Sequence, residues 1–512
     1  MMMKRLLLIL TLCLPAIMPP AAKAQENEPA WWTEIRAHSA LPLAKMEKVL
    51  SRAYEVILKK SLTLTTAEAL GTAGVKSLSD IDGGIGVYPD GARVMLIANG
   101  RILKSWTKPA PEDYRNWARV TLAAYAVALP YSKKAAQADD EEILNICINA
   151  ALALTDKYSH YNSPEKTPQK KLEKPASIGI RYRRAGKALE VTDVLPDSPA
   201  AASVLASGDR ILRIDARDTA NMSANEILNM LRGEENSPVT LVIRKDGHTE
   251  TLTLKRAAMP AGTVSSDFDA SARVLTVKIP SFSPQTVSSL SRALNEAKEK
   301  NAAGVIVDLR ANMGGLLREA VLCADLFLPE HTPMLETKGR APQAFQAFEA
   351  TTKNPLPDIP VVILIDAKTA SSAEFFAAIL QESKRAALVG TSTYGKAKIQ
   401  TAETLDNKGE IYLSWAQYYL PSGYTPDSFG LYPNICTADK NKQEFAVNES
   451  GITALGKWKT ADKSEKMHLR DLCPAQNRAS ETRDIDIAKE LIANKALYLN
   501  AINDFSLDTA EK

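Results

Sequence analysis

The chain has 512 residues, of which 45% are hydrophobic and 24% are charged, the composition of a folded protein with about three domains. Its 63 basic and 60 acidic residues leave a formal net charge of +3. This balance gives no electrostatic basis for binding nucleic acid or anionic membranes. The spacing of cysteine and histidine predicts no metal site, and we expect no cofactor.

The first 24 residues have the pattern of a secretory signal peptide. Lys4 and Arg5 supply positive charge, residues 6–17 are apolar, and Ala22-Lys23-Ala24 predicts cleavage before Gln25. The apolar run is shorter than the roughly 20 residues that a membrane-spanning helix needs. No second long apolar stretch follows. We therefore expect a protein without a membrane span, in a periplasmic or extracellular compartment.

Residues 25–170 mix helix and strand patterns. Apolar spacing predicts helices over 41–58 and 111–129, and residues 84–106 resemble two strands around turns. Residues 164–175, rich in Lys and Pro, are the expected linker to the next domain.

Residues 171–257 change to short strands with one helix. The hairpin turn Asp246-Gly247 is the clearest local signal. Strands are predicted over 191–195, 210–214, 239–243 and 249–254, and a helix over 224–231.

Residues 258–436 alternate strands and helices, which predicts an α/β fold. Residues 305–309 and 361–365 are near-continuous apolar runs, typical of strands that are buried on both faces. Ser283-Pro284 is the expected start of a helix, as a cap followed by a first-turn proline. Residues 411–420 predict another long strand.

Residues 437–512 form a polar C-terminal tail in which residues 485–499 predict one terminal amphipathic helix. Cys147 and Cys323 lie in apolar helical patterns and are expected in the core. Cys436 and Cys473 could pair in an oxidising compartment, and the sequence leaves open whether they do.

A serine in the α/β region could act as a nucleophile. None of the five histidines stands in a motif of a histidine-based triad, so such a serine would need another base, and a desolvated lysine can serve. Ser371 and Ser372 lie between the strand at 361–365 and a helix whose N-terminus offers N–H groups to an oxyanion. Taken alone, this position is explained better by helix capping than by catalysis.

Lys396 is the candidate base, and Gln400 could hydrogen-bond to it if the chain curls by one helical turn. A solvated loop lysine is the plainer interpretation. Residues 312–315, Asn-Met-Gly-Gly, follow the strand at 305–309 and uncover backbone N–H groups that could complete an oxyanion hole. The alternatives for this segment are a tight turn and nothing more, or a weak phosphate loop, which no Walker pattern supports.

In this order, these segments resemble the C-terminal processing peptidases, also called tail-specific proteases. The resemblance extends from about Asp156 to Ile435, with 25 residues from Ser371 to Lys396 and four more to Gln400. It implies a crotonase/Clp-like α/β protease core, an inserted PDZ-like β-rich domain and a mixed helical N-terminal region. The segments that carry it are 282–283, 308–315, 371–374, 385–390, 395–396, 400, 421–423 and 430–435.

The resemblance implies a role for each matching residue. Ser371 matches the nucleophile, Lys396 the general base and Gln400 the residue that orients the lysine. The backbone N–H groups of Gly314 and Ser372 match the oxyanion donors. Ser372 is the rival nucleophile, although the spacing to Lys396 favours Ser371. Met313 stands where the family usually has proline.

The inserted domain implies binding of a peptide as an added strand. The loop Ser177-Ile178-Gly179-Ile180 matches the one whose N–H groups hold a terminal carboxylate, although its isoleucines could equally be core residues. Residues 203–208 depart from the family pattern, which leaves the peptide specificity open.

We therefore expect an exported serine endopeptidase that cleaves proteins near their C-termini. The main alternative is a non-catalytic binding scaffold with the same fold, and a second is an acyl-CoA enzyme, against which the signal peptide argues. Protein or peptide substrates are the expected partners, and homo-oligomerisation or an adaptor protein stays open.

Overall fold

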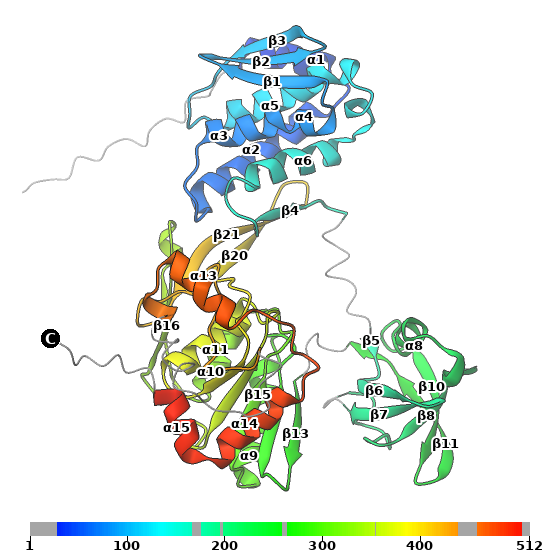
Figure 1. The fold of residues 1–512 in the computed structure, drawn as a ribbon. Coiled ribbons are helices and arrows are strands. Elements are labelled where there is room, and N and C mark those ends of the chain that lie inside the picture. The colour runs from blue at the N-terminus through cyan, green and yellow to red at the C-terminus, as the bar shows by residue number, and fades with distance from the viewer. Residues whose placement is uncertain are drawn as a thin grey trace, which may run out of the picture.

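A computed structural model describes residues 28–165, 176–194, 198–258, 264–353, 355–438 and 458–503. The predicted signal peptide and most of the predicted linker lie outside these residues. The described chain forms a helical N-terminal domain, a β-rich domain and an α/β core (Figure 1).

The N-terminal domain packs its helices around one core that includes Trp32, Tyr54 and Trp117. The strands predicted over 84–106 number three rather than two. Asn99 and Gly100 both adopt positive φ and turn the chain a second time, which separates β2 from β3. The elements are α1 (Ala30–His38), α2 (Leu43–Lys60), α3 (Ala67–Lys76), α4 (Leu78–Ile81), β1 (Ile85–Asp90), β2 (Arg93–Ala98), β3 (Arg101–Thr107), α5 (Tyr114–Ala128) and α6 (Asp140–Leu152).

The β-rich domain follows, with a sheet in the order β11-β10-β8-β7-β6 and one helix against it. The predicted turn at Asp246-Gly247 is confirmed, since both residues have positive φ and β10 pairs with β11 around them. Strand β6 is an edge of this sheet. The elements are β5 (Ala176–Ser177), β6 (Ile180–Ala185), β7 (Ala188–Val194), β8 (Arg210–Ile214), β9 (Arg217–Asp218), α8 (Ala224–Leu231), β10 (Pro238–Lys245), β11 (His248–Lys255) and β12 (Ala257–Ala258).

The α/β core is built on a sheet in the order β13-β14-β15-β18-β19-β22, which is parallel from β14 onward. Strands β15 and β18 are buried on both faces, as their continuous apolar sequences predict. The elements are β13 (Ser265–Asp269), β14 (Val274–Lys278), α9 (Thr286–Glu299), β15 (Gly304–Asp308), α10 (Leu317–Asp325), β18 (Val361–Ile365), α11 (Ser372–Glu382), β19 (Ala387–Gly390) and β22 (Ile435–Cys436).

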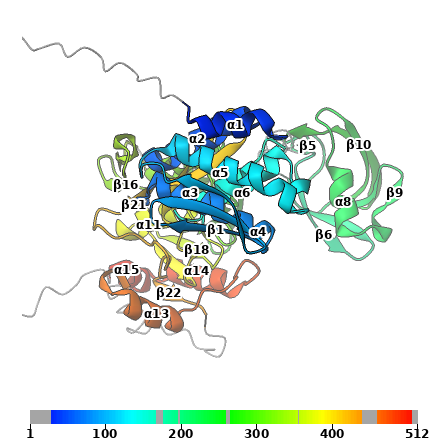
Figure 2. The ribbon, with the colours of Figure 1, turned by 90° about the horizontal axis from the view of Figure 1, so that it is seen from above.

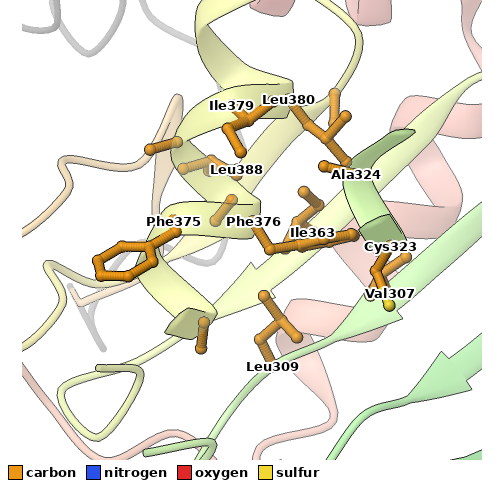
Figure 3. Packing of buried hydrophobic residues seen from close by; sticks show 14 of the residues in the cluster. Val307, Leu309, Cys323, Ala324, Ile363, Phe375, Phe376, Ile379, Leu380 and Leu388 are labelled. Atoms are coloured by element: carbon orange, nitrogen blue, oxygen red, sulfur yellow. The ribbon is translucent and has the colours of Figure 1, made fainter. Parts of the chain in front are cut away.

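Helix α11 covers one face of this sheet. Figure 3 shows Phe376 of α11 beside Ile363 of β18, and Ile379 and Leu380 farther along the helix belong to the same buried cluster. The expected helix start at Ser283-Pro284 is wrong by two residues. Ser283 instead closes a turn with Thr286, whose hydroxyl accepts a hydrogen bond from the Ser283 N–H at 2.8 Å, and α9 begins at Thr286.

The opposite face of the sheet is covered by helices from the predicted C-terminal tail. Ile487 and Leu491 of α14 (Arg483–Ala493) share a buried cluster with Ile306 and Val362. The single helix predicted over 485–499 is two helices, because Asn494 ends α14 and its side chain accepts from the Leu497 N–H at the start of α15 (Lys495–Asn503). Helix α13 (Lys463–Leu472) precedes them.

A second sheet connects the core to the N-terminal domain (Figures 1 and 2). It has the order β17-β16-β21-β20, and β4 from the end of the N-terminal domain pairs with β21. Ile411 and Leu413 of β21 enter the N-terminal core. The strands are β4 (His160–Asn162), β16 (Pro333–Gly339), β17 (Gln346–Glu349), β20 (Lys398–Thr404) and β21 (Glu410–Tyr419).

Cys436 and Cys473 form a disulfide, which settles the pairing that the sequence leaves open, and the free Cys147 and Cys323 are buried as predicted. The disulfide closes a loop with a sequence separation of 37 residues. Loop-closure entropy predicts a contribution of about 4 kcal/mol to the free energy of unfolding.

The double variant Cys436→Ser/Cys473→Ser should therefore lower the urea midpoint of unfolding by an amount equivalent to about 4 kcal/mol. As a control, dithiothreitol should lower the midpoint of the wild type and leave that of the double variant unchanged. Equal midpoints for the two oxidised proteins would contradict this assignment.

Candidate active site

Ser371 occupies the turn between β18 and α11 with φ +55° and ψ −123°. This region of backbone conformation is unfavourable for a residue with a side chain and is often found at functional sites. The Ser371 N–H donates to Oε2 of Glu374 at 2.9 Å, which fixes the turn. The nucleophile candidate is therefore held at a helix N-terminus on a strained backbone.

Ser372, the rival nucleophile, is buried, and its hydroxyl donates to the carbonyl of Gly315 at 2.9 Å. That bond ties the start of α11 to the 312–315 turn. A hydroxyl with this structural role is poorly placed to attack a substrate, which favours Ser371 as the nucleophile.

The 312–315 turn lies directly against the serine pair. A Cβ atom on Gly314, which has φ +104°, would lie 2.9 Å from Cβ of Ser371 and 3.0 Å from the nitrogen of Ser372. Only glycine fits this close approach. The Gly314 N–H donates to Oδ1 of Asn312 at 2.8 Å, so this predicted oxyanion donor is already engaged. Among the described residues, none accepts a hydrogen bond from the Ser372 N–H.

Lys396 and Gln400 contact each other, with the lysine Nζ donating to Oε1 of Gln400 at 2.8 Å. The expectation that a helical turn brings them together is wrong. Residues 398–404 form β20, and the pairing of β20 with β21 carries an irregularity between Ile399 and Gln400. The two side chains meet along an extended chain with a bulge.

Burial lowers the pKa of the Lys396 amine, and the negative charges of Asp156 and Glu374 oppose that shift. A lowered pKa increases the neutral fraction that a general base needs. Within the described residues, no hydrogen bond joins this amine to the Ser371 hydroxyl. The two residues are instead linked through their backbones.

Glu374 provides that link and is a residue whose role sequence reasoning missed. Its Oε2 accepts from the N–H groups of Ser371 and Lys396, each at 2.9 Å. Its Oε1 accepts from the Gly395 N–H at 2.8 Å and from the Thr393 hydroxyl. Burial raises the pKa of Glu374, but four donors surround it and favour the carboxylate. The signal in the sequence is a glutamate three residues after a helix cap.

Buried charges from the C-terminal segment support the strand that leads into the 312–315 turn. The Arg310 guanidinium pairs with both oxygens of Asp308 at 2.9 Å and reaches Asp484 of α14 at 3.3 Å. Asp484 also pairs with Arg478 at 3.0 Å. The negative charges of the two carboxylates in this network are balanced by the positive charges of the two guanidinium groups. No pattern in the sequence of the tail indicated this contact.

The predicted carboxylate loop lies between β5 and β6 of the β-rich domain. Ile178 is a core residue, and its carbonyl accepts from the Ala200 N–H at 2.9 Å. Gly179 has φ +78° and, within the described residues, its N–H has no acceptor. Of this loop, Ile178 therefore serves packing, and Gly179 leads into the edge strand β6. Across the described segments, no group of acidic, histidine and cysteine side chains could hold a metal ion.

Comparison with known proteins gives two family matches. Residues 273–437 match peptidase family S41, and residues 167–244 match the PDZ domain. A carboxy-terminal-processing protease from Bartonella bacilliformis is 28% identical over 58% of this chain and 70% of that protein. Carboxy-terminal processing protease CtpA from Bacillus subtilis is 28% identical over 58% of this chain and 64% of that protein.

Among solved structures, the photosystem II D1 C-terminal processing protease is 19% identical, with a TM-score of 0.41 over 79% of this chain and 96% of that one. The family matches cover the α/β core and the β-rich domain described above. They also agree with the α/β fold and the inserted domain that the sequence predicts. The chain is a serine-type peptidase whose α/β core is similar to peptidase family S41 and whose β-rich domain, ahead of that core, is similar to the PDZ domain.

Proposed function

We propose that the chain is an exported serine endopeptidase that cleaves proteins near their C-termini with Ser371 as nucleophile and Lys396 as base. The observation that carries this proposal is the half-buried Lys396, whose amine is held by Gln400 and whose backbone N–H shares the Glu374 carboxylate with the backbone N–H of Ser371. A scaffold that only binds peptides has no use for a half-buried lysine that is linked through one carboxylate to a strained serine.

In the proposed reaction, neutral Lys396 takes the proton of the Ser371 hydroxyl as the oxygen attacks the substrate carbonyl carbon. The negative charge that develops on the carbonyl oxygen is stabilised by the Ser372 N–H. The Gly314 N–H becomes a second donor to this oxygen when it gives up its hydrogen bond to Asn312. Protonated Lys396 then gives the proton to the leaving amine, which breaks the peptide bond and leaves an acyl-enzyme.

Water releases the acyl group in the second half of the reaction. Lys396 accepts a proton from the water as it attacks the ester, and returns that proton to the Ser371 oxygen as the ester bond breaks. The enzyme is then ready for another cycle. Both halves need the same lysine to be neutral at their start, so activity should rise as pH rises through the pKa of Lys396.

The PDZ domain would hold the substrate C-terminus, with the Gly179 N–H facing the carboxylate and β6 pairing with the peptide. A peptide that ends in a free carboxylate should therefore be cleaved at least about tenfold more efficiently than the same peptide with a C-terminal amide. Mass spectrometry of the products checks this. Equal rates for both peptides would remove the PDZ domain from substrate selection, while absence of any cleavage would contradict the peptidase proposal.

Export rests on the predicted signal peptide, which lies outside the described residues. Among the described residues, none of the helices combines the length and apolar character needed to cross a bilayer. The disulfide is consistent with an oxidising compartment. The mature protein should begin at Gln25 in the periplasm or the medium. Mass spectrometry of the N-terminal peptide tests this, and an intact Met1 would contradict it.

A further inference from the structure

The segment from Asp156 to Tyr161 lies beside the candidate active site although it belongs to the end of the N-terminal domain. Oδ1 of Asp156 accepts from the N–H groups of Tyr158 at 2.7 Å and Ser159 at 2.8 Å, which makes a tight turn. The chain then enters β4 and pairs with β21, where His160 stacks on Tyr412 with ring centroids 5.0 Å apart. The turn is thus fixed to the sheet that also carries Gln400.

Tyr158 contacts both residues of the lysine–glutamine pair. Its carbonyl oxygen accepts from Nε2 of Gln400 at 2.9 Å, and its ring lies 5.1 Å from Nζ of Lys396. An amide side chain has one donor end and one acceptor end. Because Tyr158 binds the donor end, the acceptor oxygen of Gln400 is turned toward Lys396.

We propose that Asp156 and Tyr158 are positioning residues of the active site, by which the N-terminal domain orients Gln400 and shields the Lys396 amine from water. This inference rests on the proposed function of that site. It gives the N-terminal domain a role in catalysis, because the catalytic base would be incomplete without a turn that this domain supplies.

The charges around Lys396 determine in which direction its pKa should shift when a neighbouring residue is replaced. Burial lowers the pKa of Lys396, while Asp156 and Glu374 raise it. Burial works against ionisation of Asp156, but the nearby Ser414 hydroxyl, the N–H groups of Tyr158 and Ser159 and the charge of Lys398 leave its pKa below the usual value, so it is negative at neutral pH. The titratable side chains on the surrounding segments are Asp156, Lys157, Tyr158, Glu374, Tyr394, Lys398 and Asp427.

Two substitutions should therefore shift the pKa of Lys396 in opposite directions. Tyr158→Ala admits water to the amine and should raise its pKa. Asp156→Asn keeps an oxygen that can accept from the two N–H groups but removes the negative charge, and should lower the pKa of Lys396. Tyr158→Phe is the matched control, because the contacts use only the backbone carbonyl and the ring. A purely structural role would not give shifts of opposite sign.

The test measures the rate at which acetic anhydride acetylates Lys396 as a function of pH, by peptide mass spectrometry of the full-length protein. We expect the midpoint of the profile to move to higher pH in Tyr158→Ala and to lower pH in Asp156→Asn, and to stay in place in Tyr158→Phe. Unmoved midpoints in both test variants, or shifts of the same sign, would overturn the inference. Circular dichroism confirms folding, and if Tyr158→Ala is unfolded, the sign of the Asp156→Asn shift decides alone.

Peptide cleavage is measured in parallel over the same pH range. Cleavage by Tyr158→Ala at neutral pH should fall by about 100-fold, and its acid limb should shift with the acetylation midpoint. If no protein cleaves peptide but the acetylation midpoints shift as expected, the proposed function fails and the inference about Lys396 stands. If wild type cleaves and the midpoints do not shift, the inference fails and the proposed function stands.

Discussion

Replacing Lys396 with methionine should abolish peptide cleavage while leaving the fold intact. Methionine keeps an unbranched stem of similar length and removes the amine, so the Ser371 hydroxyl loses its proposed proton acceptor. The loss should be about 10⁴-fold in kcat/KM, the upper end for a positioned general base. Kinetics on a fluorogenic peptide measure the loss, and thermal unfolding reports the fold.

Lys368→Met is the matched control for this variant. Lys368 is exposed in the turn three residues before Ser371, and its described contact with that turn is made by its backbone N–H. This control should retain wild-type kcat/KM. If Lys396→Met cleaves as fast as Lys368→Met, another group takes the proton from the nucleophile and the assigned base is wrong.

Replacing Glu374 with glutamine should lower both activity and stability. The glutamine side chain has one acceptor oxygen, so its NH₂ group must face two of the four donors that Glu374 satisfies. The loss of buried bonds to a charged group should cost about 3–5 kcal/mol of the free energy of unfolding. Because Ser371 and Lys396 are both tied to this carboxylate, kcat should fall by about 100-fold.

Glu382→Gln is the control that separates the loss of activity from the loss of stability. Glu382 lies at the other end of α11 and also accepts from a backbone N–H, that of Ser422 at 2.9 Å. This control should lose stability but keep the kcat of the wild type. A Glu374→Gln enzyme with unchanged kcat would show that the carboxylate does not hold the proposed nucleophile and base in place.

The α/β core could be predicted from its sequence because its signals are local. Strands β15 and β18 are continuous apolar runs, and such runs need cover on both faces. What supplies the cover on the second face could not be predicted. Ile487 and Leu491 lie in a polar tail, and their place against the sheet depends on contacts across more than 100 residues of sequence.

In the candidate site too, some features could be predicted from the sequence and others depend on long-range contacts. Ser371, Lys396 and Gln400 could be named through the family resemblance that their order and spacing carry. Their geometry could not be predicted, because the bulged strand that joins Lys396 to Gln400 depends on its pairing with β21. Glu374 stands in the matched motif, but its bond to the Lys396 N–H spans 22 residues. Tyr158 reaches Gln400 across 242 residues, a contact that no local pattern encodes.

The identity of the nucleophile and its base can be tested together by mapping the adduct of a small fluorophosphonate on the whole protein. Peptide mass spectrometry should place the adduct on Ser371 in the wild type and in a Ser372→Ala variant, and labelling should fall sharply in Lys396→Met. An adduct on Ser372, or labelling of Ser371 at an equal rate without the Lys396 amine, would contradict the account of this site.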